Sequence, residues 1–340
     1  MDISKIKASF LSKAQGIILG KKYVVFLTGR RAIITDKQLN VITEIGGLFY
    51  VYKGELSPDE TKLLLISNGT VFYVVDLNDF SLKRYAIKGR YVTNLEGIGC
   101  WDFNGNNVYI LVDMMKKDYT ELRSYSVNEG GDKTIVKVFN EYTPVCIKQV
   151  KTVNKYLIVF FDRGSEFGRY ILMWFDGQTF SEGFLIGDES DDIDAFNVDV
   201  IEDEKQIIIS GFMSSGRYDY EGKKIADITI DYQYRKSSFM DVFKNIDIID
   251  DQNKKQLSEM VKNLGLDDMS YKEAIKVFRY SHDKKYLYIG TNMRLIIVDC
   301  ETGEQLSKNV DYDVSQIEEL DDHVILVSMD YSVKIYKIQP

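Results

Sequence analysis

The sequence predicts an all-β fold built from seven repeated units, and three observations support this prediction. First, short apolar segments rich in β-branched and aromatic residues recur along the chain, and each follows a polar turn. Second, these segments recur at a spacing of roughly 40–50 residues. Third, the chain is 45% hydrophobic and 28% charged, which is the balance of a folded protein rather than a disordered one.

The seven apolar segments are the predicted central strands of the units. Turns such as 57–62, 103–107 and 281–285 precede them, since Asn, Asp and Gly tolerate the backbone angles of tight turns. A period of this length with several short strands per unit is typical of a β-propeller. We therefore predict a seven-bladed β-propeller that spans residues 1–340 as a single domain. The segments start at Tyr23, Leu63, Val108, Tyr156, Ile207, Tyr286 and Val324.

A second strand that ends in an aspartate follows most of the central strands. Examples are 71–76, 170–176 and 295–299, and a polar turn then leads to an outer strand. The units at 57–77, which begins Ser-Pro-Asp, and at 281–303, which begins Ser-His-Asp and ends Val-Asp-Cys-Glu-Thr-Gly, resemble the repeats of bacterial WD-repeat-like and YVTN-type propellers. This resemblance implies the fold and no particular activity.

The last unit is expected to need a strand from the N-terminus. It offers three strands, near Val314–Leu320, Val324–Met329 and Ser332–Ile338, where a blade has four. The stretch Ile3–Leu11 is expected to pair beside Val333–Ile338 as the fourth strand. Such pairing would remove two exposed sheet edges, which otherwise favour aggregation.

One interval between central strands is longer than the others by about 35 residues, which predicts an insertion at 234–270 within blade five. Leu257, Met260, Val261 and Leu264 have the spacing of one helix face, so the insertion is expected to be partly helical. Two interpretations stay open: the helix packs on the flank of the propeller, or it acts as a lid or a docking helix for a partner.

The sequence contains few histidines and cysteines, which are common catalytic and metal-binding residues, and they form no recognisable motif. The two histidines, His282 and His323, fall in turns of different blades, and Cys100, Cys146 and Cys300 lie far apart. Phosphate-binding glycine loops and nucleophile motifs are absent from the sequence. We therefore expect no cofactor and no metal, and we single out the acidic run 188–194 as the segment to check for calcium.

Charge and hydropathy limit the classes of partner and the cellular compartments that we expect for this protein. The net charge of −9 and pI near 5.0 argue against a nucleic-acid-binding protein. The sequence contains no apolar run of about 18 residues, so no membrane span is expected. Residues 1–22 lack the pattern of a signal peptide, and the odd cysteine count does not suggest disulfides. A monomeric cytoplasmic protein is expected.

One face of the predicted propeller is the candidate binding surface. The loops between the second and third strands of each blade lie on the same face as the loops between blades. Arg and Tyr are enriched at binding hot spots, and both types recur in these loops. The candidate partner-binding residues are Arg30, Arg31, Arg90, Tyr91, Tyr119, Arg163, Tyr218, Arg294 and Tyr331.

The predicted function is a non-catalytic protein-interaction or scaffold propeller, and its acidity favours a basic partner protein. The alternative is a hydrolase or lyase that acts on a sugar or small metabolite in the central funnel through Asp/Glu and Tyr/Arg. A closed funnel with two carboxylates of perturbed pKa would favour the enzyme, whereas a shallow aromatic rim would favour the interaction protein. The sequence leaves the choice open and leans away from an enzyme.

Overall fold

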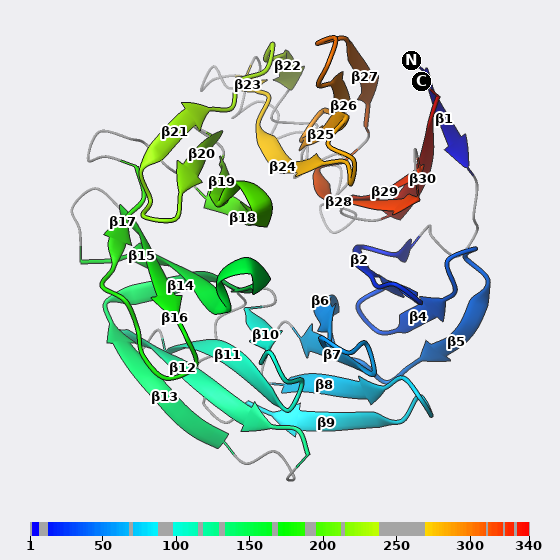
Figure 1. The fold of residues 1–340 in the computed structure, drawn as a ribbon. Helices are drawn as coiled ribbons and strands as arrows, with labels where there is room; N and C mark the ends of the chain where they lie inside the picture. Colours follow the sequence, from blue (N-terminus) through cyan, green and yellow to red (C-terminus); the bar gives the residue numbers. More distant parts are fainter. Residues whose placement is uncertain are drawn as a thin grey trace, which may run out of the picture. The chain divides into compact units, whose positions relative to one another are not determined.

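A computed structural model shows the predicted seven-bladed β-propeller (Figure 1). It describes residues 2–6, 13–67, 71–87, 98–114, 118–128, 133–164, 169–187, 195–211, 215–237, 269–310, 312–321, 324–329 and 332–339. The chain divides into two compact units. The propeller comprises Met1–Ile228 and Ile275–Pro340, and a smaller unit comprises Thr229–Ala274.

Each blade is a four-stranded antiparallel sheet, and in blades one to six the strands follow one another from the inside outward (Figure 1). Blade one contains β2 (Gly16–Leu19), β3 (Val24–Leu27), β4 (Ala32–Thr35) and β5 (Val41–Ile45). Blade two contains β6 (Val51–Leu56), β7 (Lys62–Ser67), β8 (Val71–Asp76) and β9 (Leu82–Ala86). Blade three contains β10 (Gly99–Trp101), β11 (Asn107–Met114), β12 (Tyr119–Ser126) and β13 (Lys133–Asn140).

The remaining blades repeat this order. Blade four contains β14 (Tyr142–Val150), β15 (Lys155–Asp162), β16 (Arg169–Phe175) and β17 (Phe184–Leu185). Blade five contains β18 (Ala195–Ile201), β19 (Gln206–Gly211), β20 (Ser215–Asp219) and β21 (Lys224–Asp227). Blade six contains β24 (Ile275–Tyr280), β25 (Tyr286–Thr291), β26 (Arg294–Asp299) and β27 (Gln305–Asn309). Blade seven contains β28 (Val314–Asp321), β29 (Val324–Met329) and β30 (Ser332–Gln339), with β1 (Asp2–Ile6) as its fourth strand.

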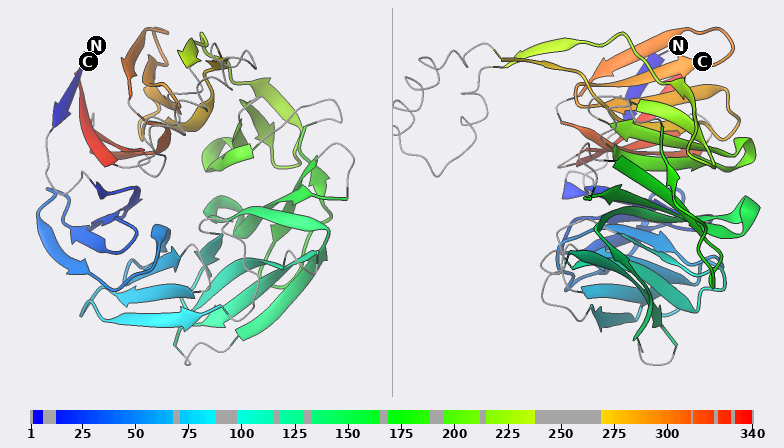
Figure 2. Two further views of the ribbon diagram at one scale, coloured as in Figure 1. Left: turned by 180° about the vertical axis from the view of Figure 1, so that it is seen from behind. Right: turned by 90° about the vertical axis from the view of Figure 1, so that its left-hand side faces the viewer.

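The blades of the propeller unit follow one another around a ring (Figure 1). Their innermost strands contact one another in the order β2, β6, β10, β14, β18, β24 and β28, and β28 contacts β2. Figure 2 shows the ring from behind and from the side. The turns between the first and second strands lie on one face, which we call the first-turn face. The loops between the second and third strands, and those between blades, lie on the other, which we call the loop face.

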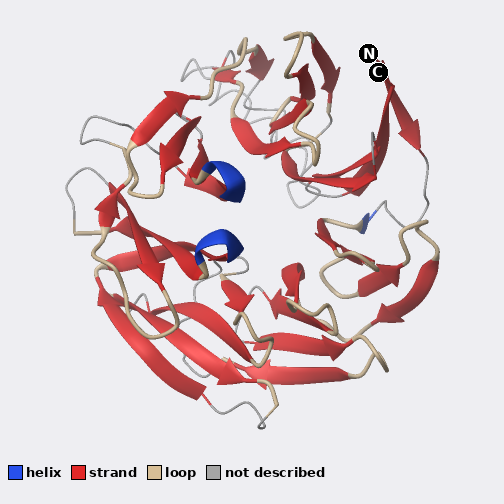
Figure 3. Cartoon of the chain, in the orientation of Figure 1, coloured by secondary structure: helices blue, strands red, loops and turns tan. Residues whose placement is uncertain are grey.

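The predicted central strands are the second strands of the seven blades: β3, β7, β11, β15, β19, β25 and β29. They are almost entirely buried because neighbouring sheets cover both of their faces, which explains their continuous apolar sequence. Figure 3 shows how fully strands dominate the structure. The sequence period therefore identified the part of each blade that has the least contact with water.

The turns before two of these strands are held by the same hydrogen bonds. The hydroxyl of Ser57 donates to Asp59 at 2.6 Å, and that of Ser281 donates to Asp283 at 2.6 Å. In both turns the serine oxygen accepts the N–H of the residue five positions later. The units at 57–77 and 281–303 thus share a turn geometry, which supports their equivalence as repeats.

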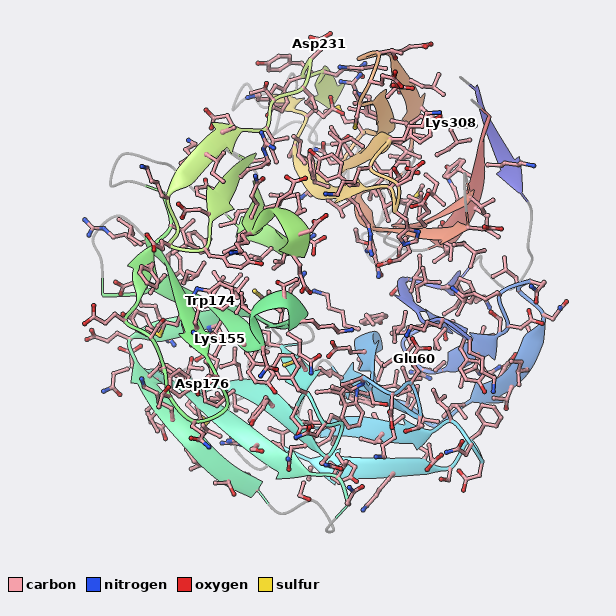
Figure 4. All side chains as sticks on the ribbon, in the orientation of Figure 1. Glu60, Lys155, Trp174, Asp176, Asp231 and Lys308 are labelled. Atoms are coloured by element: carbon pink, nitrogen blue, oxygen red, sulfur yellow. The ribbon has the colours of Figure 1, made fainter. Side chains whose placement is uncertain are left out.

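The acidic turns after the third strands also share one geometry. The carboxylates of Asp76, Asp176 and Asp299 each accept the backbone N–H of the residue two positions later. Hydrogen bonds from Thr179 and Gln178 lower the pKa of Asp176 to about 2. Asp176 is labelled among the side chains in Figure 4. These aspartates fold the chain back into the outer strand, which accounts for their recurrence.

The seventh blade combines the two ends of the chain. β1 pairs antiparallel with β30, from Asp2 opposite Gln339 to Ile6 opposite Ile335. The stretch expected to pair there was Ile3–Leu11, and residues 7–11 of it lie outside the described residues. The described strand therefore begins one residue before the expected stretch.

The prediction that the insertion interrupts blade five is wrong. All four strands of that blade, β18–β21, precede Thr229, so the smaller unit follows blade five and comes before blade six. Spacing between second strands could not distinguish these positions, because both fall inside the same interval. Within the smaller unit, β22 (Tyr234–Ser237) pairs antiparallel with β23 (Met269–Lys272).

The predicted helix with Leu257, Met260, Val261 and Leu264 lies outside the described residues. Helical structure in the described chain is confined to short turns such as the 3-10 helices η3 (Lys151–Val153) and η4 (Glu202–Glu204), which contact each other (Figure 3). No helix in the described ranges has the length and apolar character needed to cross a membrane.

A substitution at Gly16 tests the close approach of blades one and two. A Cβ at this position would overlap the carbonyl oxygen of Tyr52 on β6. We expect Gly16→Ala to lower the free energy of unfolding by about 1–3 kcal/mol, because overpacking must shift backbone. Urea unfolding measures the effect.

The control is Gly46→Ala, since a Cβ there has no atom within 4 Å. It should change the free energy of unfolding by no more than about 0.5 kcal/mol. Equal stabilities of the Gly16→Ala variant and the wild type would contradict the packing described.

Candidate functional site

The structure brings Arg30 and Arg31 of the predicted site together with two aromatic residues on the loop face. The arginines occupy the loop between β3 and β4, and Phe49 and Tyr50 precede β6 in the loop between blades one and two. Phe49 is 55% exposed and Tyr50 is 46% exposed, and both arginines are exposed. We call Arg30, Arg31, Phe49 and Tyr50 the arginine–aromatic patch.

The backbone of this patch is held in place from several sides. The N–H of Leu48 donates to the carbonyl oxygen of Arg30 at 3.3 Å, and Gly29 and Val51 exchange backbone hydrogen bonds at 3.1 and 2.9 Å. The hydroxyl of Ser67 donates to the carbonyl oxygen of Phe49. The two loops are therefore joined to each other and to blade two, although their side chains face water.

The conformation of the patch includes a strained residue. Tyr50 has φ of 46°, in the left-handed region where a residue with a side chain is disfavoured by about 1–2 kcal/mol. Its ring meets that of Phe49 edge to face, with centroids 4.6 Å apart. Strained residues of this kind cluster at functional sites, where the surrounding structure holds them in place.

Arg163 and Tyr119 lie on the loop face, but their side chains mainly contact other residues of the propeller. The Arg163 guanidinium forms ion pairs with Asp113 at 3.0 Å and Asp118 at 3.1 Å, and donates to the carbonyl oxygen of Tyr142 at 3.0 Å. Tyr119 packs against the apolar cluster between blades two and three. Both side chains therefore join neighbouring parts of the propeller.

The structure does not place Tyr218 at the loop face. Tyr218 pairs with Ile207 near the start of β19. That end of β19 lies at the first-turn face, and Tyr218 is only 2% exposed. The sequence interpretation assigned it to a loop because the short strand β20 was not recognised. Arg294 begins β26 at the loop face, but it is 8% exposed. Arg90, Tyr91 and Tyr331 lie outside the described residues.

Sequence reasoning missed Phe49 and Tyr50. Residues 48–52 form an apolar run that looks like the start of a strand, so nothing in their composition indicates exposure. The one available signal was the Gly46-Gly47 pair just before them, which favours a loop. Gly47 indeed has φ of 75°.

A pocket of about 270 Å³ opens on the first-turn face, between blades five and six. Its charged lining residues already have partners. Lys284 forms ion pairs with Asp203 and Glu204, and the Nδ1 atom of His282 lies 3.2 Å from a Glu319 carboxylate oxygen. These contacts connect blades five, six and seven at the pocket.

Polar side chains connect the innermost strands around the ring. Lys148 of β14 contacts Asp199 of β18 at 3.1 Å, and Arg279 of β24 contacts Glu318 of β28 at 2.7 Å. Gln316 of β28 bonds to both backbone groups of residue 17 in β2, at 3.1 and 2.7 Å. These polar contacts were not predicted from the sequence, because the first strand of each blade was not assigned individually.

Two acids of the innermost strands have pKa values shifted in opposite directions. Burial raises the pKa of Glu55 to about 7, although a hydrogen bond from the Trp101 N–H and the attraction of Lys151 and Lys148 oppose the rise. Burial also opposes ionisation of Asp199, but Lys148 and Arg279 lower its pKa overall. Asp199 is thus an ion-pair partner, and Glu55 is the acid that titrates near neutral pH.

The described residues do not supply the constellation that the hydrolase or lyase alternative requires. That alternative needs two convergent carboxylates with perturbed pKa values, whereas Glu55 contacts Trp101 of blade three and Asp199 is paired with Lys148. In the described ranges, no group of three or more His, Cys, Asp or Glu side chains is arranged to hold a metal ion. The acidic run 188–194 and His323 lie outside those ranges.

Replacing Glu55 tests the raised pKa of this side chain. Its folded-state pKa of about 7 exceeds the ordinary value of 4.5, so its contribution to stability is full below about pH 4.5 and is lost as pH rises through about 7. Glu55→Gln removes this loss and still accepts the Trp101 N–H. At pH 8 the free energy of unfolding of the variant should exceed that of the wild type by about 2 kcal/mol. This value allows for partial access of water to the Glu55 side chain.

The measurement is urea unfolding of both proteins at pH 5, 6, 7 and 8. At pH 5 the two free energies of unfolding should be close, and they should separate as pH rises. Parallel pH profiles for the variant and the wild type would show that Glu55 is ionised throughout and would contradict the raised pKa.

Comparison with known proteins adds no family assignment. No protein-family model and no curated protein sequence matches this chain. The structure shows a seven-bladed propeller, and the resemblance to bacterial WD-repeat-like and YVTN-type propellers stays a prediction. Function has to be argued from the residues that the fold places on its two faces.

Proposed function

We propose that the protein is a non-catalytic interaction propeller that binds another protein through the loop face, centred on the arginine–aromatic patch. The observation that supports this most directly is an exposed aromatic pair beside two exposed arginines, on a backbone anchored to blade two. Aromatic residues and Arg are enriched at interface hot spots because they combine apolar area with directed hydrogen bonds.

The patch differs from other exposed apolar residues of the propeller. Val41, Ile42, Ile135, Val138 and Ile225 are also exposed, but they lie on fourth strands at the outer edges of blades. Scattered aliphatic residues of this kind are common on protein surfaces. Phe49 and Tyr50 instead lie in a loop between two blades, and backbone hydrogen bonds hold this loop in place.

Anchoring reduces the entropy lost on binding, because the loop is already ordered before the partner arrives. A stable interface buries about 800 Å² on each partner, which is more than four residues supply. The neighbouring loops of the same face would therefore form the polar rim of the interface, with Tyr312 between blades six and seven as a further exposed aromatic residue.

The assignments that depend on family and compartment are also proposals. The shared turns of blades two and six support kinship with YVTN-type propellers. Free Cys100, Cys146 and Cys300 fit a reducing cytoplasm.

The partner was expected to be basic on the ground of the net charge of −9. The local charge of the patch is positive, however, and it is the local charge that a docked segment meets.

Truncation of the aromatic pair tests the proposed function. A Phe49→Ala/Tyr50→Ala variant and the wild type are used to capture partners from the native host. Proteins that bind specifically to the wild type should be recovered at least about tenfold less with the variant, because removal of hot-spot side chains costs about 1–2 kcal/mol of binding free energy or more.

An Ile135→Ala/Val138→Ala variant is the matched control, since these side chains are 47% and 45% exposed on β13. It should retain the partners of the wild type. Thermal unfolding confirms that both variants are folded. The proposed function is contradicted if the aromatic variant captures the same proteins in the same amounts as the control.

A further inference from the structure

The arginine–aromatic patch has a local charge opposite to that of the whole protein. Arg31 forms an ion pair with Glu44 at 3.2 Å, with side chains 64% and 46% exposed. Among the described residues, no ion pair involves Arg30, which is exposed beside it. The patch therefore presents one guanidinium without a carboxylate partner in the described structure, next to a second one whose exposed ion pair is weak.

The net charge of −9 does not decide what binds here. Charges separated by more than about 8–10 Å in water are screened at physiological ionic strength. Acidic groups elsewhere, such as Glu202–Glu204 of η4, lie on the first-turn face. A segment docked on the patch is governed mainly by the groups that it touches, which are Arg30, Arg31 and the aromatic rings.

The geometry of the patch combines two kinds of recognition. A guanidinium binds a carboxylate through two parallel hydrogen bonds, which makes it selective for planar anions. The edge-to-face pair of Phe49 and Tyr50 offers apolar surface that favours an aromatic or aliphatic side chain. The backbone contact between Leu48 and Arg30 keeps these two elements adjacent.

We propose that the arginine–aromatic patch binds an acidic segment of a partner protein, in which a carboxylate side chain lies close to an aromatic or aliphatic side chain. This inference rests on the proposed function and specifies the chemistry of the partner. The carboxylate pairs with Arg30, and the apolar side chain packs against Phe49 and Tyr50. A basic segment would place like charges beside Arg30 and Arg31, which opposes binding.

The test is selection of binders from a displayed library of random short peptides on the immobilised full-length protein. Peptides that combine Asp or Glu with an aromatic or aliphatic residue should be enriched. The dissociation constant of an enriched synthetic peptide is then measured for the wild type and for Arg30→Ala, Arg30→Glu, Phe49→Ala and Ile135→Ala. We expect binding to weaken about tenfold with Arg30→Ala and Phe49→Ala, and further with Arg30→Glu.

The control Ile135→Ala should bind the peptide within about twofold of the wild type. Enrichment of basic peptides, or no enrichment, overturns the inference, as does an acidic peptide that binds Arg30→Glu as tightly as the wild type. The proposed function fails separately, when host proteins remain bound to the Phe49→Ala/Tyr50→Ala variant. If basic or neutral peptides are selected and still require Phe49, the function stands and the acidic segment is excluded.

Discussion

Contact between neighbouring blades is the constraint on which the rest of the propeller depends. Buried apolar clusters of the described residues join blades one to two, two to three, three to four, four to five, six to seven and seven to one. Between blades five and six lies the pocket, where Asp199 and Arg279 attract each other and Lys284 pairs with Asp203. Apolar burial thus holds these six junctions, and at the junction between blades five and six ion pairs add to the buried side chains of Ile208 and Phe278.

The same contacts explain why the loop face can present an exposed aromatic pair. Blades one and two approach so closely at Gly16 that a side chain would overlap Tyr52, and Gly29 exchanges hydrogen bonds with Val51 just below the patch. The loop of Phe49 and Tyr50 therefore has little freedom to fold back onto the surface. The two blades thus hold the backbone of this loop in place, and the side chains of Phe49 and Tyr50 are exposed on it.

The sequence predicted the architecture well because propeller blades repeat their buried strands. The segments at Leu63 and Tyr286 were recognisable because continuous apolar runs follow turns with the Ser-x-Asp pattern. The candidate site was predicted only in part. Arg30 and Arg31 are where the loop topology placed them, but exposure depends on contacts between blades, so Tyr218 proved buried and Phe49 was overlooked. Charged partners such as Lys148 and Asp199 meet across blades and leave no pattern along the chain.

The central claim is that a preordered patch on the loop face is the binding surface, and amide hydrogen exchange with and without a bound partner tests it most directly. The free protein should already exchange slowly at Leu48 and Val51, whose N–H groups are hydrogen-bonded. On binding, exchange should slow at 28–31 and 44–51 and stay unchanged at the first turns 202–205 and 281–285. Slower exchange confined to those first turns, with none in the patch, would contradict the account.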